Sequence, residues 1–348
     1  MPGGVVQGGP ADVRAPGELL TAGRRHFVIF NPASGRGRGR RRIDTYRRLL
    51  EDALDRVDFA TTAGPGHERD LARRAADDGY DVVVGVGGDG TWSNVADGLV
   101  ASGRVDVVLG VLPNGTGNDF GRNLGFDPRN AADAVAVLAK GEVRRVDVGR
   151  VESASAADRS PDLWESRHFL NLVGFGFDVA VIDAAAGARF LKGEVLYKVT
   201  ALQQLFRFEG FRCEVEAVGG VRREGRHLML TVSNGRYFGG GFPIAPAADV
   251  SDGRLHACRI SDAGPFTRLR LFNLAERGRH VGSERVEIVD APHLRLRFDA
   301  PPRFELDGDV RHAREAEVEV RVLPGALGVV APALEAGSTA AHSAPQST

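Results

Sequence analysis

Three glycine-rich loops in the first third of the chain constrain its fold more than any other feature, because each follows directly on a short apolar run. The loops are residues 31–35, 87–91 and 113–120. The runs at 82–86 and 107–112 are continuously apolar, which is typical of parallel strands buried on both faces. Helical patterns of apolar residues separate the runs. We therefore predict an α/β N-terminal domain, a parallel sheet with helices on both faces.

The second half of the chain shows a different pattern, in which apolar and polar residues alternate. Examples are residues 212–218, 226–233 and 294–298. Such alternation is typical of antiparallel strands with one face in the core, so we predict a β-rich C-terminal domain, an antiparallel β-sandwich. Two helices are expected to interrupt it, near residues 195–208 and 266–277.

These patterns define the expected domain limits. Residues 24–150 should form the α/β nucleotide-binding domain, with 323–333 as a candidate segment to complete it. Residues 151–322 should form the β-rich domain that binds the substrate and contributes catalytic residues. The Gly-, Pro- and Ser-rich segments 1–23 and 334–348 are expected to be disordered tails.

Composition narrows the classes of function. The formal net charge of −1 at pH 7 argues against a nucleic-acid partner. The two cysteines, Cys213 and Cys258, cannot form a disulfide framework, which fits a reducing cytoplasm. No apolar run approaches the roughly 18 residues that a membrane helix needs. We expect a cytoplasmic protein that would reach a lipid only through transient, peripheral contact with the membrane surface.

The glycine-rich loops fall at the carboxyl ends of predicted parallel strands, the edge at which open α/β sheets bind ligands. Glycine lets backbone N–H groups approach an anion closely, and a helix start points its positive end at the same place. We therefore predict a phosphate cradle for a nucleotide in the cleft between the two domains. The candidate binding residues are Asn31, Pro32, Ala33, Ser34, Gly35, Thr62, Gly87, Gly88, Asp89, Gly90, Thr91, Gly115, Thr116, Asn118 and Asp119.

Two common nucleotide-binding motifs are absent from the sequence. It contains no Gly-x-x-x-x-Gly-Lys-Ser/Thr loop, and no Gly-x-Gly-x-x-Gly follows the first predicted strand. One glycine-rich loop alone could be a tight turn, but three on successive strands favour a binding site. The cradle must therefore be of another kind.

Several arginines follow the first loop. They could attract nucleotide phosphates or anionic lipid headgroups. A solvated basic helix start and a nucleic-acid patch are the alternatives. The arginines are Arg36, Arg38, Arg40, Arg41 and Arg42.

At these loops the sequence resembles the diacylglycerol kinase catalytic domain family, which includes bacterial soluble lipid kinases and the sphingosine and ceramide kinases. Residues 115–120, Gly-Thr-Gly-Asn-Asp-Phe, carry the resemblance more specifically than residues 87–91, because NAD kinases and phosphofructokinases have loops similar to Gly-Gly-Asp-Gly-Thr. The resemblance extends over about residues 25–333. Its further motifs lie at residues 174–178, 234–242, 246–248, 252–255 and 307–309.

The resemblance implies a kinase that uses ATP and Mg²⁺ to phosphorylate a lipid hydroxyl, most simply that of diacylglycerol to give phosphatidic acid. It implies a catalytic base from the pair Asp307 and Asp309, with Asp89 contacting the metal ion through water. The family has Glu where Asp309 stands, so this carboxylate reaches less far. The structural alternatives are a helix-capping role for Asp89 and an Asp-Gly hairpin at residues 307–309. The nucleotide would be held by Asn31, Ser34, Gly35, Thr62, residues 87–91 and Thr116.

The resemblance also implies a structural cation near Asp252, with backbone oxygens around Asp249 and Arg254 as further ligands. One departure lies after the second loop. The family usually has Asn-Glu where this chain has Ser93 and Asn94. A charge-dependent role at this place, such as metal handling or substrate choice, would be altered.

Other functions stay open from the sequence. The acceptor could be a sphingoid base, ceramide or phosphatidylglycerol instead of diacylglycerol. An NAD kinase-like enzyme would share the second loop, although residues 118–120 argue against it. A catalytically silent nucleotide- or lipid-binding protein is the third alternative. The sequence does not decide the oligomeric state, and a homodimer is one option.

Overall fold

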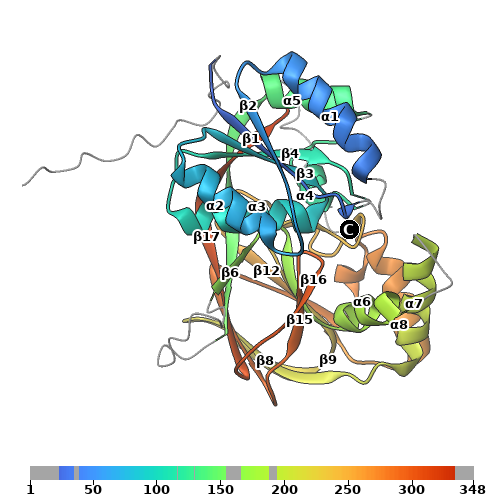
Figure 1. Cartoon of the computed structure of the whole chain (residues 1–348). Coiled ribbons are helices and arrows are strands. Elements are labelled where there is room, and N and C mark those ends of the chain that lie inside the picture. The colour runs from blue at the N-terminus through green and yellow to red at the C-terminus, as the bar shows by residue number, and fades with distance from the viewer. Residues whose placement is uncertain are drawn as a thin grey trace, which may run out of the picture.

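The computed structural model describes residues 23–34, 39–115, 117–128, 130–153, 166–187 and 194–333. Gly35, Arg36, Arg38 and Thr116 lie outside these residues, as do the predicted tails apart from Gly23. Figure 1 shows a helix-flanked N-terminal half next to a C-terminal half built largely of long strands. The predicted fold class is confirmed: parallel strands come first, and a β-rich antiparallel part follows.

The N-terminal half is built on four described parallel strands in the order β4–β3–β1–β2. Helices α1 and α5 pack together on one face of this sheet, and α2 and α3 pack together on the other (Figure 1). The strands are β1 (His26–Phe30), β2 (Val57–Thr61), β3 (Val82–Gly87) and β4 (Val108–Pro113). The helices are α1 (Gly39–Ala53), α2 (His67–Asp77), α3 (Asp89–Ser102) and α5 (Ala131–Lys140).

Strand β3 forms the centre of this half, because all of its residues are buried. Its valines suit a pleated surface that is packed on both sides. Helix α3 is fastened to it by Trp92, whose Nε1 donates to the carbonyl oxygen of Gly85 at 3.0 Å. This bond places the start of α3 beside the glycine-rich loop that ends β3.

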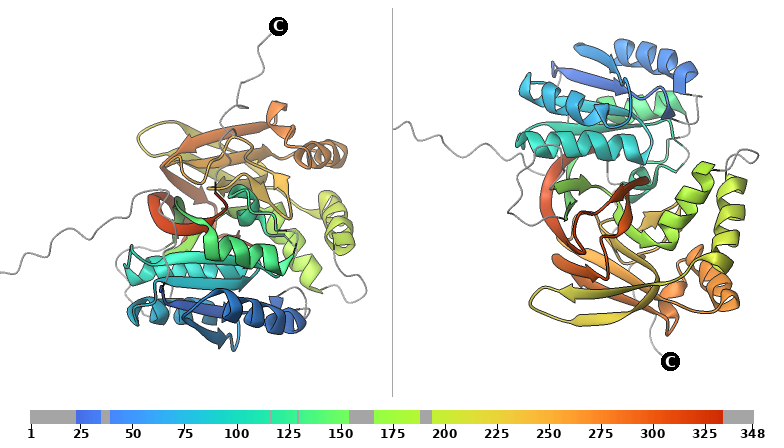
Figure 2. Two further views of the ribbon diagram at one scale, coloured as in Figure 1. Left: turned by 90° about the horizontal axis from the view of Figure 1, so that it is seen from above. Right: turned by 60° about the horizontal axis from the view of Figure 1, so that its bottom comes forward.

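The C-terminal half consists of antiparallel strands with three helices gathered at one side (Figures 1 and 2). The predicted helices near 195–208 and 266–277 correspond to α7 and α8, whereas α6 was not predicted. The helices are α6 (Phe177–Gly187), α7 (Glu194–Arg207) and α8 (Pro265–Ala275). The main strands are β6 (Ser166–Phe169), β7 (Leu172–Gly176), β8 (Phe211–Ala217), β9 (Arg222–Ser233), β12 (Leu255–Ser261), β13 (Val286–Ala291), β14 (His293–Phe298), β15 (Arg303–Leu306) and β16 (Asp309–His312).

Shorter elements complete the described chain. They are α4 (Asp119–Asn123), β10 (Tyr237–Phe238), β11 (Phe242–Pro243) and the 3₁₀ helix η2 (His280–Gly282). Among the described residues, no helix is both long and apolar enough to cross a membrane.

Two long strands, β5 (Glu142–Glu152) and β17 (Glu317–Ala331), run through both halves. The first part of β17 pairs with β14 in antiparallel fashion, while Gly328 and Val329 pair with β4 in parallel fashion. The pairing of β17 with β5 shifts register between Leu323 and Leu327. The buried carboxylate of Asp147 accepts from the N–H of Gly325 within this irregularity at 2.7 Å. All described strands except the β10–β11 pair therefore belong to one continuous sheet of 15 strands. The predicted domain limits stay a prediction.

Gly149 of β5 offers a test of this junction. An added Cβ there would lie 2.1 Å from Cζ of Phe169, a ring that is completely buried. We predict that Gly149→Ala lowers the free energy of unfolding by about 1–3 kcal/mol, because the buried ring would have to move. Urea denaturation measures this change. Gly282→Ala is the matched control, since an added Cβ at Gly282 meets nothing within 4 Å; equal losses in the two variants would contradict the prediction.

Candidate functional site

The loop after β1 is held to its neighbours by the side chain of Asn31. Its Nδ2 donates to Glu68 Oε1 at 2.9 Å and to Thr91 Oγ1 at 3.0 Å. Its Oδ1 accepts from the N–H of Ala33 at 2.9 Å, and Ser34 Oγ donates to its carbonyl oxygen at 2.7 Å. These bonds connect the end of β1 with the first turns of α2 and α3. The first two predicted loops are therefore neighbours in space.

The loop after β4 joins the same cluster. Asn114 Nδ2 donates to Ser34 Oγ at 3.0 Å, and the N–H groups of Asn114 and Gly115 donate to the carbonyl oxygen of Gly87 at 2.6 and 3.1 Å. An added Cβ at Gly115 would lie 2.7 Å from Cα of Gly88, so the two backbones touch where neither residue has a side chain. Glycine is required here for close backbone approach. Three loops thus present their backbones at one edge of the sheet.

Asp89, the first residue of α3, connects this edge to the C-terminal half. Its Oδ1 accepts from the N–H of Phe120 at 2.9 Å and from Asn171 Nδ2 at 3.3 Å. Phe120 belongs to α4, which follows the β4 loop, and Asn171 directly precedes β7. The Asp89 carboxylate therefore links the loop after β3 to the loop after β4 and to the residue that precedes β7 in the other half.

Asp119 lies beside Asp89. Its Oδ1 accepts from Arg122 at 2.9 Å, and its Oδ2 accepts from the N–H of Gly240 at 2.8 Å. An added Cβ at Gly117 would come within 3.1 Å of Asp89 Oδ2 and 3.8 Å of Asp119 Oδ2, so both carboxylates approach the same point. Burial, and secondly the charge of Asp89, raises the pKa of Asp119 to about 6. Carboxylate oxygens are the ligands that a divalent cation prefers, so these two residues are the candidates to hold one at this point.

The carboxylate of Asp307 is enclosed between the chain that leads into β7 and Ser93 of α3, with which it forms a side-chain hydrogen bond. It accepts from the N–H groups of Leu170, Asn171 and Leu172 at 2.7, 2.9 and 2.9 Å, and it is buried. Burial raises its pKa to about 6, although the N–H groups act in the opposite direction. Its backbone has a positive φ of 47°. The side chain therefore fixes the hairpin turn to the chain before β7.

Asp309, two residues later, faces the N-terminal half. Its Oδ2 accepts from Asn94 Nδ2 of α3 and from Arg311, each at 3.4 Å, and its side chain is half exposed. An added Cβ at Gly90 would lie 3.8 Å from Asp309 Oδ1. The sequence did not distinguish the two aspartates as a base. The structure separates them, because only Asp309 presents an accessible carboxylate beside the second loop.

The predicted structural cation site stays a prediction. The Oδ1 atom of Asp252 accepts from the N–H of Arg254 at 2.9 Å, and that of Asp249 accepts from Ser251 N–H and Oγ at 3.0 and 2.7 Å. Within the described part of the chain, no group of three or more His, Cys, Asp or Glu side chains could hold a metal ion. A cation there would depend on backbone oxygens.

The other predicted nucleotide-binding residues lie around the cradle. Pro32 is in the turn after β1, and Thr62 is buried at the end of β2, where its N–H donates to the carbonyl oxygen of Phe30 at 2.9 Å. Asn118 has a positive φ of 54°, and its buried Oδ1 has no hydrogen-bond partner among the described residues. Gly35 and Thr116 lie outside the described residues.

Sequence reasoning missed several residues that hold the site together. Glu68 is almost completely buried, and burial raises its pKa above the usual range of a glutamate. In the sequence, Glu68 is only an acidic residue in the first turn of a predicted helix. Such residues are common, so they are a weak indication of a functional site. Asn114 lies in the third predicted loop, but the sequence indicates no role for it. Nothing in the sequence indicates that Asn171 contacts Asp89 or that Arg122 contacts Asp119.

The chain is similar to known proteins along most of its length. Residues 25–151 match the family model described as the diacylglycerol kinase catalytic domain, and residues 171–331 match a C-terminal NAD kinase beta sandwich-like domain. A diacylglycerol kinase of Mycobacterium tuberculosis is 29% identical over 89% of this chain and 97% of its own length. A diacylglycerol kinase of Bacillus subtilis is 24% identical over 82% of this chain and 90% of its own. A solved diacylglycerol kinase structure from Bacillus anthracis shares the fold, with a TM-score of 0.64 and 21% identity over 89% of this chain and 97% of that chain.

The fold and the paired domains define the class: this is a kinase with a glycine-loop catalytic domain followed by a β-rich domain. Residues 25–151 of the chain belong to the diacylglycerol kinase catalytic domain family, as the loop motifs indicated. Membership of a kinase family implies the use of ATP.

Removal of the Glu68 carboxylate tests the role of the Asn31 cluster. We predict that Glu68→Ala lowers kcat/KM for ATP about 10- to 100-fold. The reason is that the Nδ2 group of Asn31 would lose the buried carboxylate oxygen to which it donates. Glu68→Gln keeps an acceptor oxygen at the same place and should restore most of the loss. Steady-state kinetics at varied ATP measure both variants, and an unaltered Glu68→Ala enzyme would contradict the prediction.

The raised pKa values of Asp119 and Asp307 predict the direction of the pH dependence. A carboxyl group with a pKa of about 6 carries its charge only above that pH, so both groups are neutralised as the pH falls through about 6. The rate of phosphoryl transfer should therefore fall between pH 7 and pH 5. A rate that stays constant from pH 8 to pH 5 in a stable enzyme would exclude a need for these charges.

Proposed function

We propose that this protein transfers the γ-phosphoryl group of ATP to the hydroxyl group of diacylglycerol, giving phosphatidic acid and ADP. One observation carries the proposal: the accessible carboxylate of Asp309 lies beside Gly90, in the loop that forms part of the backbone cradle. The names of the mycobacterial and Bacillus relatives support diacylglycerol as the acceptor.

The loops after β1, β3 and β4 are proposed to hold the nucleotide phosphates. Their backbones meet at one sheet edge, and the N-terminus of α3 adds its positive dipole end there. Asp89 and Asp119 are proposed to hold Mg²⁺, since both carboxylates approach Gly117. When bound, Mg²⁺ would neutralise phosphate charge that the two carboxylates would otherwise repel.

Asp309 is proposed to receive the proton of the acceptor hydroxyl. The hydroxyl oxygen forms a bond to the γ-phosphorus while the bond from that phosphorus to the β–γ bridging oxygen breaks, and ADP leaves with the electron pair. The hydroxyl proton goes to a carboxylate oxygen of Asp309. Asp307 positions this residue by anchoring the hairpin to residues 170–172.

The lipid acceptor is proposed to enter at the glycine segment 239–241, from enzyme that binds peripherally at a membrane surface. Gly240 contacts Asp119, and the flanking Phe238 and Phe242 are only half-buried. Because Gly240 stands between the two rings in sequence and contacts Asp119, the exposed parts of the rings are proposed to contact apolar substrate. Phe175, by contrast, is fully buried and packs against Phe298 and Phe304 in the core.

A transfer assay with labelled ATP and Mg²⁺ tests the proposed reaction. The acceptors to compare are diacylglycerol, a sphingoid base, ceramide, phosphatidylglycerol and NAD. We expect label in phosphatidic acid at a rate at least tenfold above that for any other acceptor. Label in another lipid would change the substrate, and label only in NADP would replace the lipid kinase assignment.

Replacement of the proposed base gives the sharper test. Asp309→Asn should lower kcat about 10²- to 10⁴-fold with little change in ATP binding, because proton acceptance is lost while the cradle is intact. Asp299→Asn, in the exposed turn after β14, is the matched control. Asp307→Asn should instead lower the melting temperature, because its amide Nδ2 would face the N–H of Leu170. Full activity of Asp309→Asn would remove Asp309 as the base.

A further inference from the structure

Exposed apolar side chains gather on two neighbouring helices of the C-terminal half. Among the described residues, the two aromatic members of this exposed set are Phe206 of α7 and Phe266 of α8, with 54% and 83% of their surface exposed. Val199 and Leu202 of α7 are also exposed. Isolated exposed apolar residues are ordinary, but a group that includes two phenylalanines indicates an interaction surface.

The geometry of α7 places its exposed apolar residues on one face. Val199, Leu202 and Phe206 are spaced three and four residues apart, the spacing of one helical stripe. Ala201 and Leu205 point to the opposite side and are buried in the core. Helix α7 therefore uses one apolar stripe for the protein core and has a second one facing outward.

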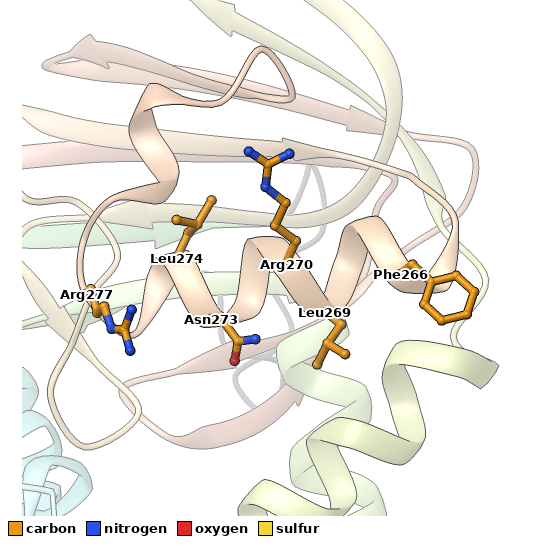
Figure 3. Close-up of a pocket in the computed structure, with 6 residues that line it drawn as sticks. All are labelled: Phe266, Leu269, Arg270, Asn273, Leu274 and Arg277. Carbon is orange, nitrogen blue, oxygen red and sulfur yellow. The ribbon is translucent and has the colours of Figure 1, made fainter.

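Arg268 ties the end of α7 to the start of α8. Its guanidinium, itself buried, donates to the carbonyl oxygens of Leu205 at 2.9 Å and Phe208 at 2.8 Å. Phe206 and Phe266 therefore lie at the same corner of the molecule, and Figure 2 shows α7 and α8 on one side in both further views. Figure 3 shows Phe266 projecting from the first turn of α8.

The same surface carries more positive than negative charge, because four exposed arginines outnumber the exposed Glu209 and Glu276. Arg207 of α7, Arg270 of α8, and Arg277 and Arg279 just beyond α8 are exposed. Among the residues that the structure describes, none of these guanidinium groups has an ion-pair partner. Arg270 and Arg277 also border a shallow depression of about 310 Å³ along α8, shown in Figure 3. Aromatic side chains next to unpaired arginines suit a partner that has an apolar interior and an anionic surface.

The end of α8 is connected to the proposed lipid entrance. An added Cβ at Gly278, three residues after α8, would lie 2.9 Å from Pro243 of β11. His280 forms a hydrogen bond with the carbonyl oxygen of Ile244 at 3.0 Å. The segment between β10 and β11 contains Gly240, which donates to Asp119. A surface bound at α8 would thus be adjacent to the segment that borders the proposed metal site.

We propose that the α7–α8 face, defined by Val199, Leu202, Phe206, Phe266 and the four arginines, docks the enzyme onto an anionic lipid bilayer. This inference rests on the proposed function, because it identifies where the enzyme meets the membrane that holds its substrate. The phenylalanines enter the acyl region, and the arginines pair with anionic headgroups.

Vesicle binding tests the docking face with the full chain. The probe is a set of vesicles of phosphatidylcholine with 30% phosphatidylglycerol, compared with vesicles of phosphatidylcholine alone. The double variant Phe206→Ser/Phe266→Ser should bind the anionic vesicles at least tenfold more weakly than the wild type. Arg270→Glu/Arg277→Glu should lose the preference for anionic vesicles. The matched control is Val105→Ser/Val221→Ser, which replaces exposed apolar residues elsewhere and should bind normally.

Kinase assays in two formats separate this inference from the proposed reaction. With a short-chain diacylglycerol dispersed in detergent, the double phenylalanine variant should keep wild-type activity. With diacylglycerol embedded in anionic vesicles, its activity should fall in parallel with binding. Vesicle binding equal to that of the wild type would overturn the docking face. So would a phenylalanine-dependent dimer, seen by sedimentation, with unaltered vesicle binding. A wild type that binds vesicles but phosphorylates diacylglycerol in neither format would refute the proposed reaction and leave the docking face standing.

Discussion

The contact between Gly88 and Gly115 is the constraint on which the rest of the site depends. At this point the loops after β3 and β4 touch backbone to backbone, and an added Cβ at Gly115 would lie 2.7 Å from Gly88 Cα. Side chains would separate the two loops and would break the hydrogen bonds from the N–H groups of Asn114 and Gly115 to the carbonyl oxygen of Gly87. The absence of side chains here is what lets two neighbouring strand ends meet at one place, which the proposed function uses as an anion-binding surface.

Carboxylates then join this surface to the C-terminal half. Asp89 accepts from Asn171, Asp119 accepts from Gly240, and Asp309 accepts from Asn94, so each bond crosses from one half to the other. In the proposed function, neither half contains all of the groups that phosphoryl transfer requires. The continuous strands β5 and β17 hold the halves together, which gives the bonds between the halves a fixed frame.

Much of the fold could be predicted from the sequence, because its signals are local. Buried strands such as β3 are continuous apolar runs, and the loops that follow them carry their glycines in sequence. Helix α6 was missed because it begins within the Gly-Phe-Gly-Phe-Asp motif, directly after β7. Strand β17 pairs with both β4 and β14, which lie elsewhere in the sequence. The sequence indicated only that residues 323–333 could complete the N-terminal domain.

The sequence predicted which residues belong to the site better than it predicted how they are arranged. The loops, Asp89, Asp119 and the aspartate pair could all be named from the sequence. The different directions of Asp307 and Asp309 could not, because they depend on the backbone N–H groups of residues 170–172. Glu68 supplies a buried carboxylate to Asn31, and only the packing of α2 against α3 shows this contact. The family has a Glu at the position of Asn94 in this chain.

Hydrogen–deuterium exchange with a magnesium complex of a non-hydrolysable ATP analogue tests the central claim most directly. If the backbone cradle holds the triphosphate, the amides of residues 88–91 and 117–120 should exchange more slowly with the analogue bound, while α7 and α8 keep their rates. Unaltered exchange at both loops, under conditions where calorimetry shows the analogue to be bound, would contradict the account.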